Sequence, residues 1–478
     1  MSFLKLGVNA ALVRTLTQNG ITSPFPIQSA SLPDAISGRD ILGRGQTGSG
    51  KTLAFGLALL TRLADRKALP NKPLALILSP TRELAMQITD VIGDLAPVVG
   101  LNAQVVAGGL SYHKQQQALR RGVTIVVATP GRLMDLMEQK DVILSDVEIT
   151  VLDEADQMAD MGFLPSVREI LNKTKADGQR MLFSATLDRD VDSLVKKYLK
   201  EPATHSVQNE TSSVTKMSHH VLVHEANHKD EITSQIAARD GRTIFFVRTK
   251  RGADKLTEKL LRAGVKVGAL HGGKTQAVRT RTLEHFKNGK TLALVATDVA
   301  ARGIHVDDVS LVVHVDAPAD HKDYLHRAGR TARAGEKGTV VSLVTMSQRG
   351  ELKRITEKAG IRPTTTSVLP GDSELIKITG SRKPSGIPIV TTVTKSDSVQ
   401  PKFPKRNRPS KARRTSNARN ESTRGESSRS ESPRGATPRS ATPRSEGGRS
   451  NSGPRKYGSD RGAAGKPKSR TGERRRAR

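Results

Sequence analysis

The stretch Gly45-Gln46-Thr47-Gly48-Ser49-Gly50-Lys51-Thr52 constrains the fold of this chain more than any other. It fits the P-loop pattern G-x-x-x-x-G-K-S/T without a mismatch. In that pattern, glycines turn backbone N–H groups onto a phosphate, the lysine adds positive charge and the last hydroxyl faces Mg2+. A strand-like run at 39–42 precedes the loop, and an apolar helix-like run at 53–62 follows it. The sequence therefore predicts a helix whose N-terminus faces the phosphates of a nucleotide.

Short apolar runs alternate with amphipathic stretches on both sides of residue 205. They lie at 74–78, 123–128, 148–152 and 180–183 in the first half, and at 243–247, 266–270, 292–296 and 311–315 in the second. Runs of this length with helices between them indicate parallel sheets covered on both faces. We therefore predict an α/β chain with tandem domains at residues 1–205 and 218–362, joined by a polar linker at 206–217.

The composition of residues 363–478 predicts a disordered basic tail. From residue 381 onward, 27 lysines and arginines stand against 7 acidic residues, and a Ser/Thr-Pro-Arg motif repeats. A segment with few apolar residues and strong self-repulsion does not bury enough surface to fold alone. The whole chain carries a formal net charge of +31, which favours a polyanion such as nucleic acid as the partner.

Composition also excludes several classes of protein. The chain contains no cysteine, which excludes disulfides, cysteine-ligated metals and thiol catalysis. No apolar run approaches the ~18 residues of a membrane span, and the first residues lack the basic segment and apolar core of a secretion signal. We therefore expect a cytoplasmic protein with no membrane partner.

Two further motifs carry chemistry. Asp153-Glu154-Ala155-Asp156 ends an apolar run, and carboxylates at the end of a strand beside a P-loop are placed to hold Mg2+ and a water molecule. Arg330 and Arg333 are three residues apart, so a helical turn would project both guanidinium groups to one side. Such a pair suits arginine fingers that neutralise charge on a γ-phosphate, although a charge run of this kind is often only a solvated face.

Taken in order, these motifs resemble those of DEAD-box ATP-dependent RNA helicases over roughly residues 1–360. The resemblance implies two RecA-like domains that bind ATP, Mg2+ and RNA. Phe3 stands 17 positions before Gly20, and with Pro24 to Gln28 it resembles the family's Q motif. This implies that Phe3 stacks on adenine and that Gln28 hydrogen-bonds the edge of the base.

The resemblance also assigns the remaining site residues. The nucleotide site comprises Phe3, Gln28, Thr47, Gly48, Ser49, Gly50, Lys51, Thr52 and Gly303. The catalytic residues are Lys51, Asp153, Glu154, Arg330 and Arg333, with Thr52 and Asp153 as the ligands of Mg2+. The RNA sugar–phosphate chain meets Thr81, Arg82, Gly109, Thr129, Arg132, Thr249, Gly272 and Thr297, with little sequence specificity. Asp156, Ser184 and Thr186 couple hydrolysis to strand separation.

Three positions depart from the family's pattern. Gly45 stands where alanine is usual, Gly273 replaces a common aspartate, and His305 replaces the aspartate that contacts the ribose in many members. His224-Glu225-Ala226-Asn227-His228 satisfies the zinc-protease pattern H-E-x-x-H. That chemistry needs both histidines on one face of a helix, whereas the motif follows a strand-like run and the next helix begins near Lys229. We therefore interpret it as a strand-to-loop junction.

The implied activity is RNA-stimulated ATP hydrolysis coupled to local, non-processive unwinding of short RNA duplexes or to remodelling of RNA–protein complexes. Ribosome assembly or RNA turnover is the expected setting, with ribosomal or RNA-decay proteins as partners of a monomer. Two alternatives remain open. One is a DNA helicase, and the other is an RNA chaperone or annealing scaffold that acts mainly through the basic tail.

Overall fold

The computed structural model describes residues 2–45, 48–206, 217–301, 306, 308–332 and 337–390. Thr47, Gly303, His305 and Arg333 lie outside these residues, as do most of the predicted linker and all of the chain after residue 390. The chain divides into two units, residues 1–403 and 404–478. The fold that follows belongs to the first unit, which contains both predicted α/β domains.

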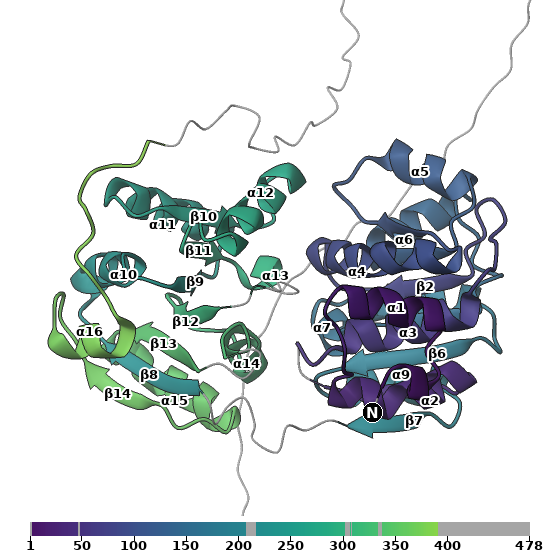
Figure 1. Ribbon diagram of the computed structural model, residues 1–478. Coiled ribbons are helices and arrows are strands. Elements are labelled where there is room, and N and C mark those ends of the chain that lie inside the picture. The colour runs from purple at the N-terminus through teal and green to yellow at the C-terminus, as the bar shows by residue number, and fades with distance from the viewer. Residues whose placement is uncertain are drawn as a thin grey trace, which may run out of the picture. The chain divides into compact units, whose positions relative to one another are not determined.

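The first domain is a parallel sheet with helices packed on its faces (Figure 1). Its strands are β1 (Ile41–Arg44), β2 (Ala75–Leu78), β3 (Ala103–Val106), β4 (Ile125–Ala128), β5 (Ile149–Leu152), β6 (Gln179–Ser184) and β7 (Ala203–Ser206). Its helices are η1 (Leu4–Leu6), α1 (Ala10–Gln18), α2 (Pro26–Ser37), α3 (Lys51–Leu63), α4 (Arg82–Leu95), η2 (Ala96–Val99), α5 (Tyr112–Arg120), α6 (Pro130–Glu138), α7 (Ala155–Asp160), α8 (Leu164–Lys173) and α9 (Arg189–Tyr198).

The second domain repeats this architecture with its own sheet. Its strands are β8 (Met217–Val223), β9 (Arg242–Phe246), β10 (Val267–Leu270), β11 (Ala293–Ala296), β12 (Val309–His314), β13 (Gly338–Val344) and β14 (Thr364–Ser367). Its helices are η4 (Ala226–His228), α10 (Lys229–Ala237), α11 (Lys250–Arg262), α12 (Gln276–Lys287), α13 (Asp298–Ala301), α14 (His321–Ala328), η5 (Met346–Gln348), α15 (Arg349–Lys358) and α16 (Ser373–Thr379).

The strand order explains the pattern of apolar runs. It is β3-β4-β2-β5-β6-β1-β7 in the first sheet and β10-β11-β9-β12-β13-β8-β14 in the second. Strands β2, β4 and β5 are buried at every position, because helices cover both faces of a parallel sheet. The runs predicted from the sequence are confirmed as strands. Strand β3 was not predicted, since three of its four residues are only half-buried and the strand has no continuous apolar run.

The second domain continues past residue 362, where the change in composition led us to end it. Strand β14 pairs in parallel with β8, and α16 follows it. The chain then runs along the end of α11, where the backbone N–H groups of Gly386 and Ile389 donate to the carbonyls of Ala263 at 3.0 Å and Leu261 at 2.9 Å. The bond from Gly386 gives the Ala263 carbonyl a partner at the C-terminal end of the helix. Ile389 adds a second donor to the Leu261 carbonyl, which also accepts from Gly264 N–H at 3.0 Å. Residues 363–390 are therefore part of the folded domain and not of a tail.

Candidate functional site

The order of the strands gathers the predicted motifs into two adjacent groups. In the first sheet, β5, β6 and β1 are neighbours, and they lead into the acidic motif, the Ser184–Thr186 motif and the P-loop. The adjacent strands β2, β4 and β3 lead into the loops that begin near Thr81, Thr129 and Gly109. The carboxyl ends of parallel strands lie at one edge of a sheet, where α/β folds bind their ligands. One edge therefore carries both the predicted phosphate site and the predicted RNA contacts.

The P-loop has the backbone conformation that a phosphate site requires. Gly48 and Gly50 both have φ of 88°, and α3 begins directly after Gly50. A β-carbon at Gly50 would stand only 2.5 Å from Gln28 Nε2 and 2.6 Å from the ring of Phe25. A β-carbon at Gly45 would stand 2.9 Å from Ser49 Oγ, a flexible hydroxyl. The departure at Gly45 therefore gives Ser49 room within the loop.

The lysine of the loop lies in a buried cluster of carboxylates. Lys51 Nζ donates to the Gly45 carbonyl at 2.8 Å and pairs with Glu154 Oε1 at 3.2 Å. Burial alone lowers the pKa of Lys51, but the charges of Glu154, Asp153 and Asp156 together raise it above the usual value. Lys51 is therefore fully protonated, and in this structure Glu154 pairs with the charge that a nucleotide phosphate would otherwise meet.

Asp153 has an electrostatic environment that favours a cation. It is buried, and burial followed by the neighbouring Glu154 carboxylate raises the pKa of Asp153 to about 7, although Lys51 opposes the shift. A divalent cation next to Asp153 would offset this crowding of negative charge. Thr52, half-buried at the start of α3, supplies a hydroxyl from the P-loop. The two residues therefore fit Mg2+, which usually takes only one or two protein ligands and keeps several waters.

Glu154 has an unusual backbone conformation. Its φ and ψ are 52° and 53°, the left-handed region, which costs a non-glycine residue roughly 1 kcal/mol or more. The residue occupies the turn between the end of β5 and the start of α7. Strain of this kind persists where the surrounding structure imposes it, and it is common at active sites. The turn directs the carboxylate of Glu154 to Lys51 of the P-loop.

The structure changes the interpretation of the Q motif. Phe3 is only 2% exposed and belongs to the hydrophobic core together with residues of α1 and α2, and stacking of Phe3 on adenine stays a prediction. Phe25 is 56% exposed and lies beside Gly50. It was missed in the sequence because we followed the spacing of the motif, whereas an aromatic residue next to Pro24 and Pro26 was itself a signal. Phe25 is therefore the exposed ring beside the P-loop.

Gln28 is committed to the P-loop itself. Its Nε2 donates to the Gly50 carbonyl at 3.0 Å, and its Oε1 accepts from the Phe25 backbone N–H at 2.8 Å. The side chain therefore holds the exposed ring and the loop in register. Contact between Gln28 and the edge of adenine stays a prediction.

The predicted coupling residues are joined by hydrogen bonds. Asp156 Oδ2 accepts from the backbone N–H of Thr186 at 2.9 Å and from its hydroxyl at 3.0 Å. The Ser184 hydroxyl donates to the Thr186 carbonyl at 2.7 Å and accepts from the Asp156 backbone N–H at 3.3 Å. The ends of β5 and β6 are thus tied together by hydrogen bonds, and the role of these residues in coupling hydrolysis to strand separation stays a prediction.

The first-domain loops present groups that suit phosphate oxygens. Thr81 caps α4, with its Oγ1 accepting a backbone N–H at 3.3 Å. Gly109 has φ of 81°, and a β-carbon there would require the end of the Arg82 side chain to move. Arg132 lies over the ring of Tyr112 at 5.0 Å and forms an ion pair with Asp135, with Nε 3.5 Å from Oδ2. Its Nη1 is buried and has no hydrogen-bond partner among the described residues. Thr129 precedes α6, which places Arg132 in the first turn of that helix.

The second domain repeats the arrangement on β9, β11 and β10, which are neighbours in the sheet. Thr249 caps α11, with its Oγ1 accepting a backbone N–H at 2.9 Å. Gly272 follows β10, and Thr297 follows β11. The loop after β10 is closed by a bond from its backbone to a side chain, because Gly273 N–H donates to the His271 ring nitrogen Nδ1 at 3.1 Å. Because glycine replaces the aspartate that is common in the family at position 273, this loop has no carboxylate there.

Arg330 lies directly after α14 and is largely buried. Its backbone N–H donates to the Arg327 carbonyl at 3.1 Å and its Nε to the His326 carbonyl at 3.2 Å. The following Thr331 hydroxyl donates to the Val309 carbonyl, and Ala332 has φ of 53°. The turn that carries Arg330 is therefore clamped against β12.

Side chains of the two domains meet at motif positions. Glu83 of α4 accepts from Gln276 Nε2 at 2.8 Å and pairs with Arg279 Nη2 at 2.7 Å, and these three residues are buried. Lys322 of α14 donates to Asp188 Oδ2 at 2.6 Å, near the end of the segment that follows β6. The helix that leads to Arg330 therefore contacts the part of the first domain that continues from Ser184 and Thr186.

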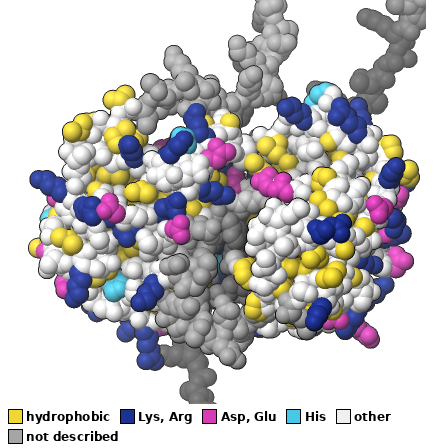
Figure 2. Space-filling view, viewed as in Figure 1, with side chains coloured by type: hydrophobic (Ala, Val, Ile, Leu, Met, Phe, Trp, Pro, Cys, Tyr) yellow, Lys and Arg dark blue, Asp and Glu magenta, His cyan; other side chains and the backbone are white. Residues whose placement is uncertain are grey.

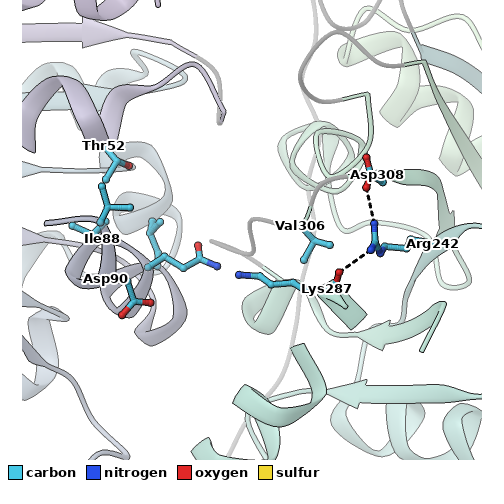
Figure 3. Close-up of a pocket in the computed structure, with 10 residues that line it drawn as sticks. Thr52, Ile88, Asp90, Arg242, Lys287, Val306 and Asp308 are labelled. Carbon is cyan, nitrogen blue, oxygen red and sulfur yellow. Dashed lines mark hydrogen bonds and ion pairs between the residues drawn. The ribbon is translucent and has the colours of Figure 1, made fainter. Parts of the chain in front are cut away.

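A cavity of about 500 Å³ lies next to the P-loop helix (Figure 3). It is lined by Thr52, Leu84, Gln87, Ile88, Asp90 and Val91 from the first domain and by Arg242, Lys287, Val306 and Asp308 from the second. Arg242 Nη1 pairs with Asp308 Oδ2 at 2.8 Å, and Nη2 donates to the Lys287 carbonyl at 2.7 Å. Thr52 is the one member of the predicted nucleotide site among these lining residues.

The H-E-x-x-H stretch lies at the junction that the sequence predicts. His224 follows β8, and α10 begins at Lys229, so the two histidines do not share a helical face. His224 Nδ1 is 2.8 Å from the Glu225 carbonyl. Within the described residues, no three acidic, histidine or cysteine side chains converge on a metal position. None of the helices in that part of the chain is both long and apolar enough to cross a bilayer.

Comparison with known proteins covers both domains. The profile for DEAD/DEAH box helicases matches residues 25–194, and that for the helicase conserved C-terminal domain matches residues 227–335. The ATP-dependent RNA helicase RhlB of Xanthomonas campestris pv. campestris is 40% identical over 382 residues, which is 77% of this chain and 67% of that protein. The chloroplastic DEAD-box ATP-dependent RNA helicase 3A of Zea mays is 40% identical over 374 residues, or 76% and 50% of the two chains. The structure of S. cerevisiae Dbp5 bound to RNA and ADP BeF3 has a TM-score of 0.71 at 31% identity, covering 79% of this chain and 98% of that one.

Proposed function

Because the chain belongs to the DEAD-box family of ATP-dependent RNA helicases, we propose that it couples RNA-stimulated ATP hydrolysis to local, non-processive unwinding of short RNA duplexes. The observation that carries this proposal is the division of the first sheet. Three neighbouring strands lead into phosphate-binding and acidic motifs, and the next three lead into phosphate-contacting loops. ATP and an RNA backbone would therefore bind along one edge.

The chemistry follows from the buried cluster. Lys51 leaves Glu154 and binds the phosphates of ATP, which frees the Glu154 carboxylate to orient a water molecule and accept its proton. Thr52 and Asp153 would hold Mg2+, which when bound neutralises charge on the β- and γ-phosphates. Arg330 and Arg333 complete the charge neutralisation from the second domain. Hydrolysis therefore depends on closure of the two domains, and RNA binding by both domains favours that closure.

RNA specificity would rest on the sugar–phosphate chain. The predicted contacts are hydroxyls, glycine N–H groups and arginines at the ends of strands, and such groups fix the position of a strand without reading its bases. A bent single strand held by both domains would exclude its complement over a short stretch. We also propose that the protein acts in ribosome assembly or RNA turnover, with ribosomal or RNA-decay proteins as its partners.

A duplex-unwinding assay tests the function directly. We expect ATP-dependent separation of a short RNA duplex, and stimulation of ATP hydrolysis by single-stranded RNA well above that by single-stranded DNA of the same sequence. Equal stimulation by DNA would favour the DNA-helicase alternative. Annealing activity that persists in Lys51→Ala protein without ATP, with no unwinding by the unsubstituted chain, would favour the RNA chaperone.

The raised pKa of Asp153 predicts a pH-dependent Mg2+ site. A carboxyl with a pKa of about 7 must lose its proton before it binds a cation. The Mg2+ concentration that half-saturates binding of a fluorescent ADP analogue should fall about fivefold between pH 6 and 7 and less than twofold between pH 7 and 8. The stability of the metal-free protein changes in the opposite direction. A raised carboxyl pKa increases the free energy of unfolding at low pH, and this stabilisation is lost as pH rises toward 7.

Asp153→Asn provides the control for this pH dependence. The nucleotide phosphates also titrate in this range. The asparagine variant retains the pH dependence that comes from the phosphates and loses the part that comes from residue 153. The difference between the two proteins therefore measures Asp153. Identical pH profiles would show that Asp153 does not take part in cation binding.

Truncation tests the contribution of the residues after 390. On the face shown in Figure 2, basic side chains are interspersed with acidic and apolar ones, whereas residues 391–478 hold 25 lysines and arginines and 7 acidic residues. A chain ending at residue 390 should bind RNA roughly tenfold or more weakly at ~50 mM salt. The slope of log K against log salt should fall by about 0.7 for each phosphate released. Basal ATP hydrolysis should be unchanged.

The end point of that truncation matters. A chain ending at residue 380 also loses the backbone bonds of Gly386 and Ile389 to α11, worth about 0.5–1.5 kcal/mol each, so its melting temperature should fall as well. A full-length variant with the lysines and arginines of 391–478 replaced by glutamine separates charge from chain length. If RNA affinity survives that replacement, the segment has another task.

A further inference from the structure

Helix α14, which leads to Arg330, packs on a row of rings that no step of the proposed reaction uses. The row comprises Phe246 of β9, His314 of β12, Tyr324 of α14 and His219 of β8. The strands β9, β12, β13 and β8 are consecutive in the sheet. The helix that leads to the proposed arginine finger therefore rests on two histidines, of which His314 is buried and His219 is half-buried.

His314 fixes the centre of the row. It lies opposite Phe246 and Ser342 in the strand register, is fully buried, and has Nδ1 3.0 Å from Ser342 Oγ. Its ring meets that of Tyr324 edge-on, with centroids 5.0 Å apart and planes at 83°. Aromatic pairs prefer this arrangement, so the position of the Tyr324 ring over the sheet is well defined.

Tyr324 and His219 make the polar contact of the row. The Tyr324 hydroxyl is 2.9 Å from His219 Nδ1, and the two rings stack with centroids 5.8 Å apart at 30°. Burial, followed by the charge of His220, lowers the pKa of His219 to about 4, so the imidazole is neutral near pH 7. Within the described residues, His219 Nε2 is buried without a partner. The bond to Tyr324 is therefore the hydrogen bond that ties β8 to α14 at this point.

Arg327 provides a second attachment of α14. Its Nε and Nη2 pair with the two carboxylate oxygens of Asp298 at 2.5 and 2.8 Å, and its Nη1 donates to the Asp316 carbonyl at 2.7 Å. Tyr324 and Arg327 are three residues apart and so lie on the same side of the helix. These two attachments fix both the rotation of α14 about its axis and its position over the sheet. Arg330 follows Arg327 by three residues.

We propose that the His219–Tyr324 hydrogen bond is a positioning contact that sets α14 so that Arg330 reaches the γ-phosphate on closure. This inference rests on the proposed role of Arg330 in hydrolysis. The helix has only eight residues. Arg327 and the clamped turn at Arg330 hold its C-terminal end, and the Tyr324 hydroxyl holds it one turn earlier, against β8. His219 and Tyr324 touch neither ATP nor RNA in this scheme, and they act through the helix.

Tyr324→Phe, His219→Phe and the double variant test the proposal. Each single change breaks the bond, and we expect kcat of RNA-stimulated ATP hydrolysis to fall roughly 10- to 100-fold, since a displacement of about 1 Å can cost 10²-fold. Binding of a fluorescent ADP analogue should not change, because the first domain grips the nucleotide. In the double variant, thermal stability should recover, since an apolar pair replaces a polar one, whereas kcat should stay low.

Recovery of kcat together with stability in the double variant would overturn the proposal, as would normal kcat in both single variants. Tyr198→Phe is the matched control, because its hydroxyl also bonds within the fold, to the Arg168 carbonyl at 3.2 Å and Asn172 Oδ1 at 3.0 Å. Its kcat should match that of the unsubstituted protein. Arg330→Ala separates the two levels: if it retains full turnover, the proposed role of Arg330 fails; if it alone is inactive, only the positioning contact fails.

Discussion

Glu154→Gln is expected to lower RNA-stimulated ATP hydrolysis by about 10²–10⁴-fold, the usual contribution of a general base. The amide retains the shape of the side chain but does not accept a proton from water. It also removes the ion pair with Lys51 at 3.2 Å, which competes with the nucleotide for the lysine. ATP binding should therefore persist or become tighter while turnover disappears. Single-turnover hydrolysis checks the loss of turnover, and binding of a fluorescent nucleotide to the same preparation checks that affinity persists.

Glu138→Gln is the matched control for this substitution. Glu138 lies at the exposed end of α6, so the same chemical change there should leave turnover and nucleotide binding intact. Undiminished hydrolysis by Glu154→Gln would remove this residue from the mechanism. Loss of ATP binding together with turnover would instead assign Glu154 a role in shaping the P-loop.

The linear order of motifs predicted the fold and the edge of the sheet at which the motifs gather, and the reason is physical. Buried parallel strands require continuous apolar runs. Each run ends at the carboxyl edge of the sheet, where a polar motif follows, so the sequence shows the strand and its motif side by side. The pairing of Lys51 with Glu154 follows from that logic, because the two residues stand after β1 and β5, the strands on either side of β6. Edge strand β14 escaped prediction because all four of its residues are polar.

Spacing in the sequence does not show how a side chain packs. Phe3 has the spacing of the Q-motif aromatic, but η1 and α1 fold it into the core, whereas Phe25 is fixed beside the loop by Gln28 and the tight approach to Gly50. The network from Asp156 to Ser184 and Thr186 was predicted as a coupling motif by resemblance. Its hydrogen bonds depend on β5 and β6 being neighbours, a property of the folded sheet that spacing in the sequence does not show.

Arg330→Ala should reduce RNA-stimulated hydrolysis by roughly 10³–10⁵-fold, the range found for arginine fingers. Arg330 is built into a clamped turn after α14, and α14 reaches the first domain through Lys322 and Asp188 at 2.6 Å, so its charge arrives only with the second domain. ATP affinity should be unchanged, because the first domain holds the nucleotide. Arg349→Ala, at the exposed start of α15, is the control and should hydrolyse ATP normally.

A second substitution at position 330 separates the charge of the side chain from its shape. Arg330→Lys retains the charge but loses the planar fork that suits phosphate oxygens, so its turnover should lie between those of the alanine variant and the unsubstituted protein. Full activity in both variants would show that the second domain does not supply the charge at this point. Hydrolysis would then depend on Lys51 and Mg2+ alone, and RNA would have no route through Arg330 by which to accelerate it.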